Sequence, residues 1–184
     1  MPEVAVSPQE FALVDFDAGR IVAIAAKLLG DIGLSGPLHI DIDESTPAGR
    51  ITVESLSPLR VAVQGGAFED TRRPRQLSER RVADSLGRVL MRAGDRLDPA
   101  FGNPPADDDL TLAESAAWDV YAVGRLARLG YPVQRQRRLY QFRTRHGFSD
   151  DVDGAFERLW NGEGITWGDI RAVCDASASG AVTR

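Results

Sequence analysis

The sequence predicts an α+β fold, with a small, mostly antiparallel sheet of three to four strands packed by helices and a helical C-terminal half. Segments with helical spacing of apolar residues occur near the start and again from residue 78 onward. Between the first two of these segments, three short stretches alternate apolar and polar residues, as half-buried strands do. No linker in the 184 residues is long enough to separate domains, so we expect one domain with flexible ends at 1–10 and 175–184.

The first half of the chain is expected to hold two helices with three strands between them. A helix is predicted at 16–32, and Gly33 is suited to end it. Strands are predicted at 38–43, 50–54 and 60–64. Turn residues between these stretches favour a meander, in which each strand pairs with the next one along the chain. The second helix, 78–96, carries a single apolar stripe.

The second half is expected to be helical throughout. A third helix opens with Thr111 and Glu114, which match a capping box, and ends at Gly130. The basic stretch 135–145 can form a helix. Ser149 is placed to cap the next helix, and Thr166 to cap the last one.

Composition limits the classes of function that the chain can have. The net charge of −5 argues against general affinity for nucleic acid. Lys27 is the only lysine, so 22 − 1 = 21 of the basic residues are arginine, as is typical of a GC-rich genome. No apolar run approaches the roughly 20 residues that cross a membrane, and the N-terminus has no features of a secretory signal. The single cysteine, Cys174, fits a reducing compartment, so we expect a cytoplasmic protein with no membrane association.

One stretch carries a resemblance to a known family. Residues 82–90 read VADSLGRVL, and they resemble the active-site helix of zincin-type metallopeptidases, which reads HExxH and often HELGHVL. Asp84 stands at the first histidine, Ser85 at the glutamate and Arg88 at the second histidine. The order of a helix, three strands and this helix is also similar to the compact zincin core, so the resemblance extends over about residues 16–97.

The three substitutions remove the chemistry that the family's motif performs. Histidines four residues apart on a helix can both reach one Zn²⁺, but Asp84 and Arg88 at this spacing favour an ion pair instead. A guanidinium cannot bind a metal, and Ser85 has no pKa suited to act as a base near neutral pH. The family's third ligand often comes from a later glutamate, for which Glu114 is the candidate, although its capping-box role already accounts for it. We therefore expect no metal, no cofactor and no catalytic residue here.

The arginine-rich stretch 135–145 is the best candidate for binding an anion or a partner. Its candidate residues are Arg135, Arg137, Arg138, Tyr140, Arg143 and Arg145. Arginines interleaved with aromatic rings can hold phosphates and stack on bases. They can equally dock an acidic protein surface or the chain's own acidic residues, and their stems can cover apolar surface.

Two other patterns have simpler explanations. Asp41 and Asp43 in LHIDIDES resemble the DxDx[TV] loop of haloacid-dehalogenase-like phosphotransferases, but that loop should end a central parallel strand, whereas this stretch is expected to precede a hairpin. Carboxylates on the outer face of a strand explain the pattern better. His39 and His146 belong to no motif with metal-ligand spacing, and Cys174 suits a small buried side chain.

Three functions remain open on these grounds. The leading hypothesis is a non-catalytic protein with a degenerate zincin-like core that acts through protein–protein contacts. A second is an enzyme or small-molecule-binding protein whose site is not visible in the sequence. The third is a nucleic-acid-associated module that uses residues 135–145, which the net charge disfavours. The oligomeric state is left open.

Overall fold

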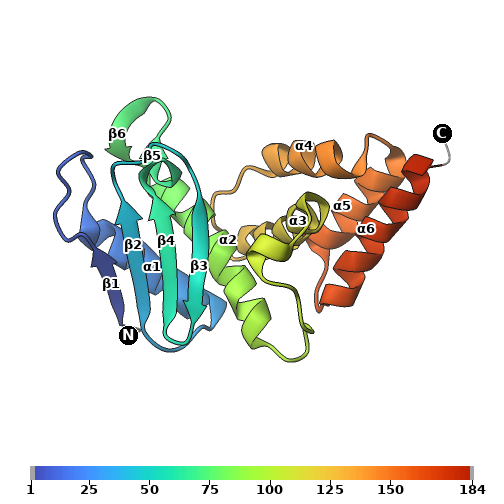
Figure 1. The fold of residues 1–184 in the computed structure, drawn as a ribbon, viewed down its shortest axis with the longest axis horizontal. Coiled ribbons are helices and arrows are strands. Elements are labelled where there is room, and N and C mark those ends of the chain that lie inside the picture. The colour runs from blue at the N-terminus through green and yellow to red at the C-terminus, as the bar shows by residue number, and fades with distance from the viewer. Residues whose placement is uncertain (1–2, 183–184) are drawn as a thin grey trace. The chain divides into compact units, whose positions relative to one another are not determined.

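The computed structural model describes residues 3–182 and has an α+β fold (Figure 1). The chain divides into two compact units, Met1–Gly94 and Asp95–Arg184. The boundary falls inside helix α2 (Glu79–Leu97). The first unit contains the sheets, and the second contains helices only within its described residues. Single-domain organisation stays a prediction.

The main sheet has four strands in the order β1-β2-β4-β3. The strands are β1 (Val4–Ser7), β2 (Leu38–Asp43), β3 (Ile51–Leu56) and β4 (Leu59–Gln64). β2 pairs in parallel with both β1 and β4, and only β3 and β4 are antiparallel. The expected mostly antiparallel meander is therefore wrong, although the β3–β4 hairpin within it is present.

The parallel pairing has two causes, one of which is a strand that the sequence did not reveal. β1 lies within the segment expected to be flexible, and it is only four residues long. Helix α1 (Ala18–Ile32) connects β1 to β2, and such a crossover brings two strands together in parallel. The segment 44–50 then leads from β2 to β3, which lies at the edge of the sheet. The chain turns back from β3 into β4, and β4 fills the place between β3 and β2.

Helices α1 and α2 cover one face of this sheet (Figure 1). Alternate strand residues on that face are buried: Val6, Leu38, Ile40, Leu59, Val61 and Val63. The intervening residues of β2 and β4 lie on the other face of the sheet. They are polar or small, and they are more exposed than the apolar residues. Each side chain points to the face that its polarity suits, because successive residues of a strand alternate between faces.

A tight crossing of two loops closes one end of the first unit. After β4 the chain makes a short turn, η1 (Gly65–Ala67), and then a two-stranded sheet of β5 (Glu69–Asp70) and β6 (Arg73–Leu77). A Cβ at Gly66 would lie only 1.9 Å from the carbonyl oxygen of Pro47. Only glycine allows the two backbones to approach so closely.

The second unit packs four helices around an aromatic core, and a short exposed turn, η2 (Asp107–Asp109), precedes the first of them. The helices are α3 (Leu112–Arg128), α4 (Arg135–His146), α5 (Asp150–Asn161) and α6 (Trp167–Val182), and α3 contacts each of the others. Trp118, Phe142 and Phe156 are almost fully buried in this core. Asp95, 5% exposed, accepts a hydrogen bond from the Trp118 indole at 2.7 Å and a two-point contact from Arg125. The central position expected for the third helix agrees with these contacts.

The predicted helix ends form as expected. Gly33 adopts a left-handed conformation with φ of 82°, and Thr111 and Glu114 make a reciprocal capping box. Ser149 accepts the amide of Val152, and Thr166 exchanges hydrogen bonds with Asp169. These contacts satisfy backbone groups that a helix end otherwise leaves without a partner.

The two chain ends were expected to be flexible. Residues 4–7 form β1, and α6 extends to Val182. Residues 1–2 and 183–184 lie outside the described residues. Over 3–182, no helix has both the length and the hydropathy that crossing a membrane requires.

Candidate functional site

The positions that resemble the zincin motif lie on α2 in the first unit, where Asp84, Ser85 and Arg88 are all half-buried. The Ser85 hydroxyl donates a 3.4 Å hydrogen bond to the carbonyl of Ala67, in the turn that follows β4. One helical turn earlier, Arg81 donates to the same carbonyl at 3.3 Å and to that of Gly66 at 2.9 Å. This side of α2 therefore holds the η1 turn in place.

A metal at these positions would need other ligands. Within residues 3–182, no three side chains of histidine, cysteine, aspartate or glutamate are grouped so that they could hold an ion. Glu114, the candidate third ligand, belongs to the second unit, and there its carboxylate accepts hydrogen bonds from the amide and hydroxyl of Thr111. The capping role of Glu114 is confirmed, and these hydrogen bonds give no support to a role as a metal ligand.

The arginine-rich stretch forms α4, and three of its arginines contact acidic residues of the second unit. Arg143 makes a two-point contact with Asp153, including a 2.7 Å hydrogen bond. These hydrogen bonds lower the pKa of Asp153 and raise the pKa of Arg143. Arg135 pairs with Glu157.

Arg138 lies 3.4 Å from Asp119, and both side chains are largely buried. With Arg135 and Arg143 it makes α4 part of the internal packing of the second unit. Arg137, Tyr140 and Arg145 stay exposed, and the ring of Tyr140 meets that of Phe148 edge to face at 6.3 Å. The alternative that these arginines dock on the chain's own acidic residues thus holds for three of the five, which reduces the charge left for phosphates.

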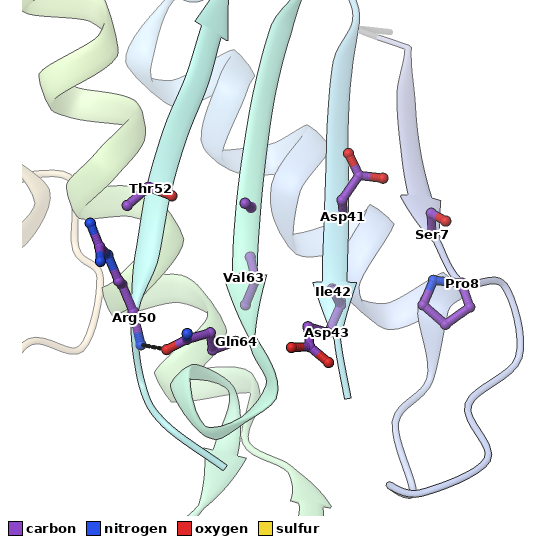
Figure 2. Close-up of a pocket in the computed structure, with 10 residues that line it drawn as sticks. Ser7, Pro8, Asp41, Ile42, Asp43, Arg50, Thr52, Val63 and Gln64 are labelled. Atoms are coloured by element: carbon purple, nitrogen blue, oxygen red, sulfur yellow. Dashed lines mark hydrogen bonds between the residues drawn. The ribbon is translucent and has the colours of Figure 1, made fainter. Parts of the chain in front are cut away.

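A trough of about 510 Å³ lies on the sheet face opposite α1 and α2 (Figure 2). Its lining residues come from all four strands of the main sheet, from the residue after β1 and from the residue before β3: Ser7, Pro8, Asp41, Ile42, Asp43, Arg50, Thr52, Ala62, Val63 and Gln64. They gather toward the carboxyl ends of the three parallel strands. In open sheets with parallel strands, this end is where ligands bind.

The trough follows from the register of the strands. Ser7 pairs with Asp41, Asp41 with Ala62, and Ala62 with Thr52, so these four form one row across the sheet. Three of the four side chains are small, and the row is therefore low. The next row along the strands carries the longer side chain of Gln64, whose oxygen accepts the Arg50 amide at 3.2 Å (Figure 2).

The two aspartates of β2 play different parts. Asp43 accepts hydrogen bonds from the Ser45 amide and from the hydroxyls of Ser45 and Thr46, and these bonds lower its pKa. Its carboxylate thus orders the loop after β2. Asp41 instead lies in the low row, half-exposed, with Arg60 3.6 Å away.

This stretch precedes the β3–β4 hairpin, as expected, but it also ends a central parallel strand, because β2 lies between two parallel neighbours. Outward carboxylates on a strand still describe Asp41. The trough as a whole was missed by sequence reasoning, since alternation in the strands predicts a polar face but not which residues of different strands share a row. The chain matches no protein-family model, no curated protein and no solved structure.

Proposed function

We propose that the first unit is a degenerate zincin-like core and that the protein acts by binding a protein partner rather than by metal-dependent chemistry. The replacement of the motif's chemical positions by Asp84, Ser85 and Arg88 carries this proposal. Ser85 holds a turn where the family would have its catalytic glutamate. The order of α1, the main-sheet strands β2, β3 and β4, and then α2 supports the likeness to a zincin core. The short strands β5 and β6, which also lie between β4 and α2, and the mostly parallel sheet depart from what we expected.

The trough is the surface we assign to the partner, and an extended peptide segment is the occupant that it suits. Its low row crosses four strands, which is roughly 14 Å at the usual strand spacing and matches about four residues of extended chain. Asp41 at the centre of this row attracts a basic side chain. Its contact with Arg60 is solvent-exposed and therefore worth little, so that a partner's arginine or lysine can replace it.

The test is a selection of peptides from a displayed random library on the full-length protein, followed by measurement of their affinity in solution. We expect extended sequences with a basic residue. Ala62→Gln fills the low row and should weaken binding at least tenfold, and Asp41→Asn should weaken it by a smaller factor. Ala23→Gln is the matched control, because Ala23 lies on the exposed side of α1 in the same unit.

Two results would overturn partner binding at the trough. One is the recovery of no peptide above the background of an unrelated protein. The other is equal affinity for the wild type and for Ala62→Gln. The degenerate motif is tested separately by dialysis against Zn²⁺ and metal analysis: we expect far less than one zinc per chain, and one tightly held zinc per chain would contradict it.

A further inference from the structure

A second pocket, of about 670 Å³, lies within the second unit. The end of α4, the first turns of α5 and the middle of α6 enclose it. Its apolar wall includes Phe142, Val152, Ala155 and Val173. His146 and Ser177 also line it, and neither belongs to any motif visible in the sequence.

These two polar residues are joined to each other. The Oγ of Ser177 lies 2.8 Å from Nδ1 of His146, and Nε2 of the same ring lies 3.0 Å from the carbonyl oxygen of Ala113. Phe142 stacks on the imidazole with ring centroids 4.1 Å apart. The ring is thus held on both nitrogens and on one face, and its position is fixed by three elements of the unit.

The carbonyl decides how the proton is placed on a neutral ring. A carbonyl oxygen can only accept, so Nε2 carries the hydrogen that it donates to Ala113. Nδ1 then has a lone pair and accepts the hydrogen of the Ser177 hydroxyl. This is the arrangement in which a histidine can take a proton from a serine, with the carbonyl orienting the base.

The surroundings favour the neutral ring. Burial lowers the pKa of His146, although the hydrogen bond with Ala113 acts in the opposite direction. The nearby thiol of Cys174 is a poor competitor as a nucleophile, because burial raises its pKa to about 11. The carbonyls of Cys174 at 2.9 Å and Val173 at 3.1 Å are also within hydrogen-bond distance of the Ser177 hydroxyl, and they can take its hydrogen when His146 is protonated.

We propose that Ser177 is a nucleophile and His146 its general base, in a site that transfers the acyl group of small, uncharged esters. The apolar wall suits a short acyl chain. The rim carries Asp150, Asp151 and Arg158, a net negative set that disfavours anionic substrates. The first turn of α5, which Ser149 caps, also borders the pocket.

The proposed reaction consumes only the ester and water. Ser177 Oγ forms a bond to the ester carbonyl carbon as its proton passes to Nδ1 of His146. The C–O bond to the alcohol breaks, and the alcohol leaves with that proton. Water then attacks the acyl-serine with His146 again taking a proton, and the carboxylic acid leaves as Ser177 is regenerated.

The test is covalent labelling of the full-length protein by an alkyl fluorophosphonate, whose phosphorus binds a serine oxygen with loss of fluoride. We expect one adduct per chain on Ser177 in a digest read by mass spectrometry, and its absence in Ser177→Ala. Ser179→Ala is the matched control, since Ser179 lies on the same helix and bonds its own helix carbonyl at 2.9 Å. It should label like the wild type.

The role of His146 is tested on the wild-type protein, so that the folding of a variant does not matter. The labelling rate should fall as the pH is lowered and the imidazole takes a proton. His146→Gln should label at least about 100-fold more slowly than the wild type, provided that circular dichroism shows the variant to be folded. Absence of an adduct on Ser177, equal labelling in Ser177→Ala, or a rate that does not fall at low pH would overturn the proposal. It is independent of peptide binding at the trough.

Discussion

The contact between α3 and α5 makes the sharpest stability prediction. Gly124 of α3 is buried, and a Cβ built on it would lie 2.2 Å from the carbonyl oxygen of Trp160 and 2.9 Å from its carbonyl carbon. Both are backbone atoms, so no side chain can turn away to make room. Gly124→Ala must therefore push the two helices apart, by about 1 Å if the carbon–oxygen distance is to approach normal contact.

The expected change in the free energy of unfolding of Gly124→Ala follows from two opposing effects. Alanine in a helix interior is favoured over glycine by up to about 1 kcal/mol. Overpacking a close-packed interior typically costs about 1–3 kcal/mol and occasionally more. The clash here lies at the upper end of that range, because separation of α3 from α5 also disturbs the contacts of Arg128 with the carbonyls of Trp160 and Gly162. We expect a net loss of about 2 kcal/mol.

Gly154→Ala is the matched control, on α5 of the same unit. A Cβ there meets only the end of the Arg158 side chain, at 3.6 Å, so the helix preference should prevail and the variant should be slightly more stable. Urea unfolding followed by circular dichroism measures both changes. A loss of about 2 kcal/mol corresponds to roughly 4–8 °C in Tm if the chain unfolds as one domain of 150–250 residues, and to roughly 8–16 °C if a unit of 60–100 residues unfolds by itself. The reasoning fails if Gly124→Ala is as stable as the wild type or as Gly154→Ala.

Three further predictions concern other contacts. Gly66→Ala should unfold or strongly destabilise the first unit, because the new Cβ would meet Pro47 at 1.9 Å; a hydrogen–deuterium exchange pattern unchanged over residues 3–94 would contradict this. Asp95→Ala should cost about 3–5 kcal/mol in urea unfolding, since it leaves a buried indole N–H and a guanidinium without their carboxylate, and a loss below about 1 kcal/mol would refute that role. The pKa of His146 is lower in the folded than in the unfolded protein, so the unfolded chain binds more protons between the two values. The contribution of His146 to stability is therefore complete above about pH 6.5 and is lost as the pH falls through the folded pKa. His146→Gln should remove that part of the pH dependence of the free energy of unfolding, and an unchanged dependence would show that another group causes it.

Local structure was predictable wherever it depends on neighbours along the chain. The capping box of Thr111 and Glu114 and the cap at Gly33 could be predicted, because the residues that make each of them are at most a few positions apart. The strands β2 and β4 could be predicted from alternation. β1 could not, because four residues next to prolines carry too little pattern to stand out from a loop.

The candidate sites were less predictable than the helices and strands. The stretch around Asp84 was visible because its likeness to a motif is contiguous in sequence. The trough was not, because Ser7, Asp41, Ala62 and Thr52 become neighbours only through the pairing of four strands. Ser177 and His146 are 31 residues apart and face each other only when α6 packs beside α4.

The sequence alone determined that the first half of this chain has two helices with strands between them, that the second half is helical, and that the positions resembling the zincin motif carry Asp84, Ser85 and Arg88. Those properties depend on residue types and on spacings of two to four positions, which short-range sterics and hydrogen bonding control. Only the tertiary structure decided that β2 lies between two parallel strands, that most of the α4 arginines are neutralised within their own unit, and that a serine meets a histidine beside a pocket. Strand order and helix packing depend on burying apolar faces that are distant in the chain, and no local spacing records which partners will meet.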